Sequence, residues 1–205
     1  MIRASHHPFW TSFMRFFTFV KMRLHFRDVM IDAPDAVPGQ QAVLLIGNHY
    51  SWWDGFTANY LNIKHFNKKF HVMMLEEELR QRRFLSKAGA YSIQPFSRQV
   101  LESLHYTNEL LKDNNNLVLL FPQGLIQSVY QHPLRFASGW YKALDSQTLP
   151  SIFFMVTLPE YGSYAKPTLY IYVKQYYPSE NSGPADLEKE FNLFLAHCIS
   201  KSRLA

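Results

Sequence analysis

Short apolar runs recur along the chain at intervals that suit the buried strands of a sheet. Most side chains in each run are apolar, which is typical of a strand covered on both faces. The runs cover residues 42–47, 70–75, 117–121 and 152–157. Residues 168–174 instead alternate between apolar and polar side chains, which predicts a fifth strand with one face exposed.

Helical segments separate the predicted strands. In residues 76–87 the acidic side chains come first and the basic side chains last, the order that complements a helix dipole. The other predicted helices cover residues 54–61, 98–112 and 184–201. This alternation predicts an α/β fold with a layered, largely parallel central sheet flanked by helices. We expect a single domain over residues 1–205.

The N-terminal stretch, residues 9–27, differs from this core pattern. Apolar side chains recur there at helical spacing, with basic side chains among them. The apolar positions are Phe13, Phe16, Phe17, Val20 and Leu24, and the basic ones are Arg15, Lys21, Arg23 and Arg27. The combination favours a membrane-interfacial helix within residues 1–30. A helix that docks on the protein core explains the same pattern, so both interpretations stay open.

The composition is that of a folded, basic protein. Hydrophobic residues make up 47% of the chain and charged residues 18%, which excludes an intrinsically disordered chain. The formal charge of +5 favours an anionic partner. The basic residues are spread along the chain, without an RNA-binding signature or zinc-finger spacing. We therefore expect a surface of anionic lipid or an acidic substrate, and no nucleic acid.

Cysteine content and the length of the apolar runs bear on location. Cys198 is the single cysteine, which excludes an intramolecular disulfide framework and favours a reducing compartment. No uninterrupted apolar run reaches the roughly 18 residues that a membrane-spanning helix needs. We therefore expect a peripheral protein on the cytoplasmic side of a membrane.

The candidate chemistry follows the first predicted strand, where the functional groups of α/β folds commonly collect. Residues 48–54 read Asn-His-Tyr-Ser-Trp-Trp-Asp. Imidazole groups are suited to proton transfer near neutral pH, so His49 is a candidate general base toward an attacking hydroxyl or amine. If Asp54 begins the next helix, its carboxylate can fold back and orient the imidazole. The alternative is a surface histidine followed by a helix-capping aspartate.

A second block follows the third predicted strand, where residues 121–124 read Phe-Pro-Gln-Gly. The pair of blocks resembles the glycerolipid (lysophospholipid) acyltransferase family, of the 1-acylglycerol-3-phosphate acyltransferase type. That family carries an NHxxxxD block, matched here by Asn48, His49 and Asp54, and a later FPEG block. The resemblance covers roughly residues 40–160.

The resemblance implies a reaction and a division of roles. A fatty acyl group would pass from a thioester, acyl-CoA or acyl carrier protein, to a hydroxyl or amine of a lipid acceptor. His49 would be the base and Asp54 its partner, while Phe121, Pro122 and Gly124 would shape the acceptor loop. No metal and no bound cofactor are implied.

Three positions depart from the family pattern. Gln123 replaces the acid of FPEG, and Ile126 and Pro95 stand where arginines are expected. Arginine binds phosphate through parallel charge-assisted hydrogen bonds, each contributing about 1.5–3 kcal/mol, and neither replacement can donate one. We therefore expect an acceptor head group that is less anionic than glycerol 3-phosphate, such as a hydroxylated or amino lipid. Arg98 and Arg135 are candidate substitutes that would restore phosphate binding.

Further side chains near the base are candidates for substrate contact. Asn48 and Gln123 belong to the two blocks, and Trp52 and Trp53 lie in the turn after His49. The tryptophans are expected to wall an acyl channel or touch a bilayer, with core packing as the alternative. We expect the base and its carboxylate to meet beside an apolar pocket deep enough for a fatty chain.

Two other functions remain open: a non-catalytic lipid-binding protein with the same fold, and an acyl-thioester hydrolase that admits water to the same base. A serine hydrolase is disfavoured because Ser51 lacks a G-x-S-x-G environment. A metal site is disfavoured because His6, His7, His65 and His71 lack the spacing of metal ligands.

Overall fold

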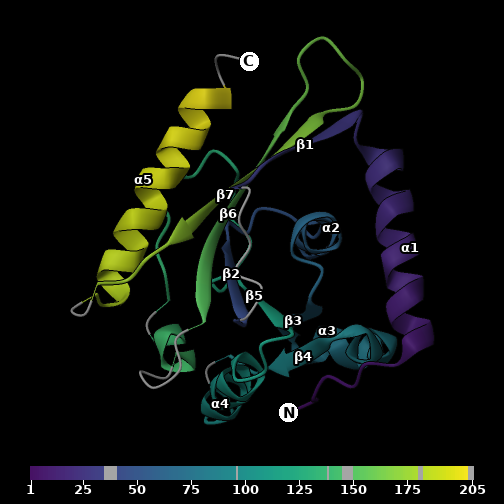
Figure 1. Cartoon of the computed structure of the whole chain (residues 1–205), viewed down its shortest axis with the longest axis vertical. Coiled ribbons are helices and arrows are strands. Elements are labelled where there is room, and N and C mark those ends of the chain that lie inside the picture. Colours follow the sequence, from purple (N-terminus) through teal and green to yellow (C-terminus); the bar gives the residue numbers. More distant parts are fainter. Residues whose placement is uncertain (35–40, 96, 138, 145–149, 180–181, 203–205) are drawn as a thin grey trace.

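A seven-stranded sheet lies at the centre of the computed structural model, which describes residues 1–34, 41–95, 97–137, 139–144, 150–179 and 182–202 (Figure 1). The strands are β1 Asp28–Asp32, β2 Val43–Gly47, β3 Lys69–Leu75, β4 Ala90–Ile93, β5 Asn116–Leu120, β6 Ser151–Glu160 and β7 Thr168–Tyr176. Their order across the sheet is β1-β7-β6-β2-β5-β3-β4. Every neighbouring pair is parallel except β6 and β7. The predicted fold class is therefore confirmed.

Helices cover both faces of this sheet. The α-helices are α1 Pro8–His25, α2 Asp54–Leu61, α3 Glu76–Gln81, α4 Val100–Leu111 and α5 Pro184–Ser202. Three short helices are η1 Asn62–Phe66, η2 Arg83–Ala88 and η3 Trp140–Ala143. Figure 1 shows α1 and α2 on one side of the sheet and α5 on the other.

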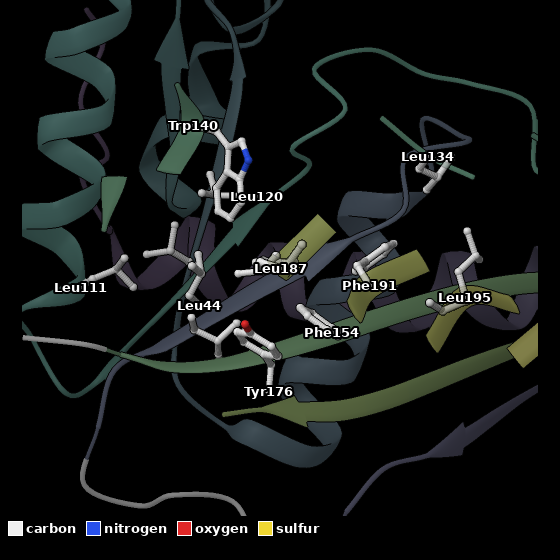
Figure 2. Packing of buried hydrophobic residues seen from close by; sticks show 14 of the residues in the cluster. Leu44, Leu111, Leu120, Leu134, Trp140, Phe154, Tyr176, Leu187, Phe191 and Leu195 are labelled. Atoms are coloured by element: carbon white, nitrogen blue, oxygen red, sulfur yellow. The ribbon is translucent and has the colours of Figure 1, made fainter. Parts of the chain in front are cut away.

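Strand β2 is buried along its whole length because helices cover it on both faces. Its side chains alternate between two apolar clusters, with Leu44 in the cluster under α5 and Leu45 in the cluster under α1 and α2. In the first cluster the rings of Phe154 and Phe191 lie 5.2 Å apart and connect β6 to α5 (Figure 2). The C-terminal end of β2 is therefore a well-packed platform for the residues that follow it.

Residues 76–87 do not form the single helix that the sequence predicts, because α3 ends early and a 3-10 helix follows it. The N-terminal segment pairs with this region: the backbone N–H groups of Ser5 and His7 donate to the carbonyls of Ser86 and Lys87 at 2.8 and 2.9 Å. These tertiary hydrogen bonds are made to the more tightly wound 3-10 helix. The charge pattern of residues 76–87 does not predict these hydrogen bonds.

Two strands were not predicted, β1 and β4, and both lie at edges of the sheet. β1 alternates between exposed and half-buried positions and has an aspartate at each end, and β4 has four residues. Such short or polar edge strands give a weak periodic signal. The other predicted elements are present, with ends that differ by a few residues.

Helix α1 docks on the core and also leaves an apolar face exposed. Thr18 and Met22 are buried against the rest of the protein, so the docked interpretation is confirmed for the inner face. The outer face carries an exposed apolar stripe formed by Phe9, Phe13, Phe16 and Leu24. Within the described residues, no helix is long and apolar enough to cross a membrane.

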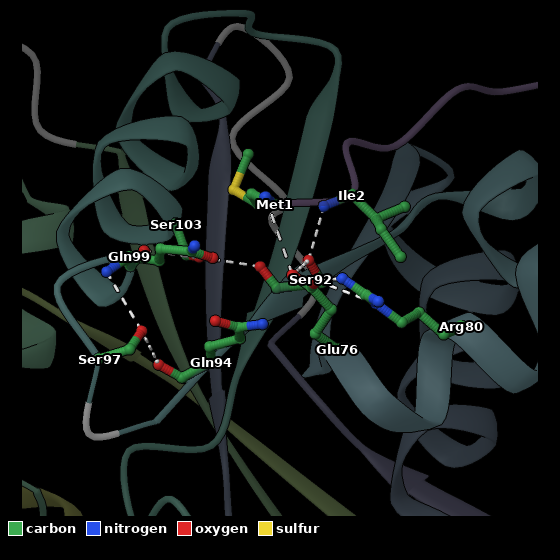
Figure 3. A network of polar contacts seen from close by, with 9 residues as sticks. All are labelled: Met1, Ile2, Glu76, Arg80, Ser92, Gln94, Ser97, Gln99 and Ser103. Atoms are coloured by element: carbon green, nitrogen blue, oxygen red, sulfur yellow. Dashed lines mark hydrogen bonds and ion pairs between the residues drawn. The ribbon is translucent and has the colours of Figure 1, made fainter.

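A polar network joins the N-terminal segment to the start of α3 and the end of β4 (Figure 3). Glu76 accepts hydrogen bonds from Arg80 at 2.7 and 3.1 Å and from the Ser92 hydroxyl at 2.9 Å. The backbone N–H of Ile2 donates to the same hydroxyl at 2.7 Å. The hydrogen bonds from Arg80 hold the pKa of Glu76 below its usual value of 4.5, and they outweigh the opposing effect of burial.

Glu76→Gln is expected to change how stability depends on pH. Because the pKa of Glu76 is lower in the folded chain, the stabilisation from its carboxylate is complete above about pH 4.5 and is lost as the pH falls through the folded pKa. The variant should be less stable near neutral pH and should lose less additional stability on acidification, as measured by urea unfolding at a series of pH values. Glu77→Gln, at the exposed neighbouring position, is the matched control. Equal acid slopes for wild type and Glu76→Gln would contradict this role.

Candidate active site

The turn after β2 brings His49 and Asp54 together, as the sequence predicts. Asp54 is the first residue of α2, and its Oδ2 accepts a hydrogen bond from His49 Nδ1 at 2.8 Å. The same oxygen accepts the backbone N–H groups of Tyr50 and Ser51 at 2.8 and 2.9 Å. These two backbone bonds fold the carboxylate back over the turn and fix its distance from the imidazole.

Burial shapes the electrostatics of this pair. The Asp54 side chain is fully buried, and burial raises the pKa of its carboxyl, while hydrogen bonds from His49, Ser51 and Tyr50 oppose the shift. Its second oxygen, Oδ1, has no hydrogen-bond partner within the described residues. An ionised carboxylate only accepts, so it orients His49 with the proton on Nδ1 and the lone pair on Nε2. A positive charge that forms on the imidazole would stabilise the poorly solvated carboxylate.

The imidazole of His49 lies flat against the ring of Phe121, with ring centres 4.2 Å apart and planes 11° apart. Phe121 follows β5, which is paired in parallel with β2, so both rings leave the same edge of the sheet. Gly47 makes this stacking possible, because a Cβ there would lie 2.9 Å from the Phe121 ring. Phe121 therefore supports the His49 ring directly, a more specific contact than the predicted shaping of a loop.

Gln123 connects the two sequence blocks through the backbone of His49. Its Oε1 accepts the His49 N–H at 2.7 Å, and its Nε2 donates to Gln127 Oε1 at 2.6 Å. The Gln127 N–H in turn donates to the His49 carbonyl at 2.9 Å. Both backbone groups of His49 are thus held by the loop after β5. The sequence analysis missed Gln127, because no motif indicates which polar loop side chain folds back onto its neighbour.

Asn48 has a structural role and also lines the hollow beside His49. Its buried amide donates to the Thr157 carbonyl at 3.1 Å and accepts the Thr157 N–H at 2.9 Å. This bridge ties the turn to β6 and uses both ends of the Asn48 side chain.

The hollow beside His49 is small. Asn48, His49, Tyr50 and Gln123 form one wall, and Ser128, Val129, Gln131, Leu134 and Leu195 form the other. Its empty volume is about 200 Å³, including space open to solvent, whereas small-molecule pockets occupy about 300–1,000 Å³. The prediction of an apolar pocket deep enough for a fatty chain at this position is therefore wrong for the described residues. A larger hollow of about 680 Å³ shares Val129 and extends along α5 to Ser202, with the polar Glu160 and His132 in its lining.

Two predicted contact residues lie in the turn itself. Trp52 is exposed and packs against Trp53 and Phe56, with ring centres 5.5 and 4.9 Å apart. Trp53 is half-buried and its ring centre lies 4.3 Å from that of His25 in α1. Neither tryptophan lines the hollow beside His49, so the role of channel wall is not supported.

The loop after β5 is a tight turn anchored to the segment that follows it. Pro122 is buried, and its carbonyl accepts the Ala137 N–H at 2.7 Å. Gly124 adopts a φ of +73°, a conformation that favours glycine, and its N–H donates to the Phe121 carbonyl at 3.0 Å. Both residues shape the loop without lining the hollow at His49.

The two candidate phosphate-binding arginines are exposed and do not line this hollow. Arg98 follows β4, three strand spacings from β2, which is about 14 Å across the sheet. Arg135 lies in the segment that Ala137 holds against Pro122. No group of three or more His, Cys, Asp or Glu side chains that could hold a metal occurs in the part of the chain that the structure describes.

Comparisons with known proteins identify a protein family and a solved structure of similar fold. Residues 28–152, more than half of the chain, match the protein family described as Acyltransferase. Among solved structures, the fold is similar to that of the 1-acyl-sn-glycerophosphate (LPA) acyltransferase PlsC from Thermotoga maritima, with a TM-score of 0.67. The match has 15% sequence identity and covers 95% of this chain and 80% of that one, so it bears on the fold alone. A search of curated proteins found no match.

Gln123→Leu is expected to lower the free energy of unfolding by about 1–3 kcal/mol, because it leaves the His49 N–H without its acceptor. Gln123→Glu should be milder, because a carboxylate still accepts this N–H and the Gln127 amide can turn round to donate. The Gln123→Glu/Gln127→Glu double variant should lose more than the sum of the single changes, because two carboxylates would face each other. Urea unfolding at neutral pH is measured for wild type, Gln123→Leu, Gln123→Glu, Gln127→Glu and the double variant. Additive effects of the two glutamate changes would refute the coupling.

Proposed function

Because the chain belongs to the acyltransferase family, we propose that it moves a fatty acyl group from an acyl thioester to a hydroxyl or amine of a lysolipid-type acceptor. The observation that carries this proposal is the hydrogen bond between His49 Nδ1 and buried Asp54. It leaves Nε2 of His49 as a base beside a solvent-accessible hollow. The acceptor itself is the nucleophile, so no enzyme serine or cysteine is required.

The reaction runs through one tetrahedral intermediate. As the acceptor oxygen or nitrogen attacks the thioester carbonyl carbon, its proton passes to His49 Nε2. The intermediate collapses by breaking the carbon–sulfur bond, and the imidazolium returns the proton to the departing thiolate. Asp54 stabilises the imidazolium between these two transfers and keeps the ring in one orientation. Acyl product and free thiol leave, and the base is restored.

We propose acyl-CoA or acyl carrier protein as the donor, with neither a metal nor a bound cofactor in the reaction. The formal charge of +5 suits anionic donors of this kind. The thioester needs no metal activation because the thiolate is a good leaving group. The same charge supports contact with a membrane surface of anionic lipid. We propose that this surface is the cytoplasmic side of a membrane and that nucleic acid has no role in the function.

The acceptor head group is proposed to be less anionic than glycerol 3-phosphate. Ile126 occupies the position of the family's arginine, and it is exposed beside the turn that holds His49. Pro95, at the other arginine position of the pattern, supports the same conclusion because its side chain cannot donate a hydrogen bond to a phosphate.

His49→Ala is expected to reduce acyl transfer by about 10²–10⁴-fold, because it removes the base. Asp54→Asn should also reduce transfer strongly, because it weakens the orientation of the imidazole. Free thiol and acylated acceptor are measured in parallel, and His197→Ala, at an exposed position on α5, is the control. Wild-type protein without turnover on any thioester would favour the lipid-binding alternative. Thiol release at the same rate without an acceptor would favour the hydrolase.

Neutral and amine-bearing lysolipids are expected to be better acceptors than lysophosphatidic acid, because Ile126 and Pro95 stand where the family pattern has arginines. Ile126→Arg should increase the use of lysophosphatidic acid by about tenfold or more, the effect of about one charged hydrogen bond. Ile126→Ala controls for the loss of the isoleucine. A clear wild-type preference for the phosphorylated acceptor would defeat this assignment.

A further inference from the structure

A pair of histidines lies away from the candidate active site, where residues 2–7 pack against β3, β4 and η2. His71, on β3, has an exposed fraction of 2%, and His6 is half-buried. Their ring centres are 4.6 Å apart and their ring planes are at 70° to each other. Neither ring lines the hollow beside His49, so the proposed reaction leaves this pair without a role.

The imidazole of His71 is buried without close hydrogen-bond partners. Among the described residues, neither of its ring nitrogens has a partner at hydrogen-bond distance, and the buried Oδ1 of Asn116 lacks one as well. A neutral ring leaves one donor and one acceptor unsatisfied there, whereas a protonated ring would leave two donors and a charge. Burial and the neighbouring His6 lower the pKa of His71 from 6.5 to about 4, against an opposing effect of Asn116. The docked arrangement therefore favours the neutral ring.

His6 is one of the residues that hold the N-terminal segment in place. Its Nε2 donates to the Phe70 carbonyl at 3.0 Å. Gly89 leaves room for this ring, because a Cβ there would lie 2.8 Å from the same nitrogen. On either side of His6, the backbone N–H groups of Ser5 and His7 donate to carbonyls of η2. The segment that leads into α1 is thus fastened to the core around His6.

The groups around the pair oppose its protonation on balance. Burial lowers the pKa of His6 most and Lys69, on β3, lowers it further, while the hydrogen bond to Phe70 raises it. Lys69 also lowers the pKa of His71, and Asp113, before β5, raises it. Protonation of both rings would place two positive charges side by side near a third, with one carboxylate to offset them.

We propose that His6 and His71 form an acid-sensitive latch, in which protonation of the two rings releases residues 2–7 from β3 and η2 while the rest of the fold stays assembled. The latch is independent of the proposed acyl transfer and goes beyond it. Because both pKa values are lower in the docked segment, docking is complete above about pH 6.5 and weakens as the pH falls towards 4. Helix α1 stays docked, because Thr18 and Met22 are buried against the core beyond the latch.

Amide hydrogen exchange followed by NMR tests the latch on the wild-type chain. Between pH 7.5 and 4, the protection factors of the Ser5 and His7 amides are expected to fall about a hundredfold, because a pKa lowered from 6.5 to about 4 changes the docking equilibrium by that factor. The amides of Leu45 and Leu119, in the buried strands β2 and β5, should keep their protection. The ring C–H signals in the same samples report the pKa of His71.

His71→Phe separates the latch from general sensitivity to acid. Phenylalanine keeps a ring at this position, cannot be protonated, and gives up no hydrogen bond at close distance, so the protection of Ser5 and His7 should change by less than about tenfold over the same range. His71→Gln, which also stays uncharged, takes its place if the larger ring prevents folding. His105→Gln, at an exposed position on α4, is the control and should respond to acid like wild type.

Four results would overturn the latch. The first is protection of Ser5 and His7 that stays constant down to pH 4 in wild type. The second is an equal loss of protection in wild type and in the folded His71 variant. The third is a His71 ring that titrates near pH 6.5 while the segment stays protected. The fourth is a loss of protection at Leu45 and Leu119 at the same pH, because the whole fold would then be opening.

Discussion

One oxygen of Asp54 accepts hydrogen bonds from an imidazole and from two backbone N–H groups, and the geometry of the site depends on this convergence. The carboxylate is buried at the start of α2, where helix N–H groups favour negative charge. Its other oxygen has no partner among the described residues. The imidazole is thus the side chain that stabilises this charge most directly, so the orientation of His49 is a consequence of solvating Asp54.

Two adjacent parallel strands supply the rest of the site. The turn after β2 carries His49, and the loop after β5 carries the Phe121 ring stacked on its imidazole and the glutamine that holds its backbone. Gly47 allows the close approach of Phe121, because a larger residue would displace the ring. Such contacts explain why blocks about seventy positions apart in the sequence act together. They also fix the neighbouring loop residues.

The sequence predicted well what is local to a segment and poorly what depends on strand order. His49 and Asp54 could be paired from the sequence because a turn and the first residue of a helix bring them together. The place of β4, the strand before Arg98, could not be predicted because nothing in the sequence around it indicates that β4 lies at the far edge of the sheet. Gln127 was missed because its partner depends on how two loops meet. The deep pocket failed as a prediction because apolar composition does not reveal whether a cavity is filled.

The pairing of β1 with β7 sets an order of events during synthesis. Residue 28 lies opposite residue 168, so the first strand made is completed by a strand that leaves the ribosome about 140 residues later. Helix α1 emerges before either strand, with its aromatic stripe already present in the sequence. For most of translation this helix has no finished sheet to dock on. The exposed apolar side chains of α1 are therefore made well before the strand that completes the sheet.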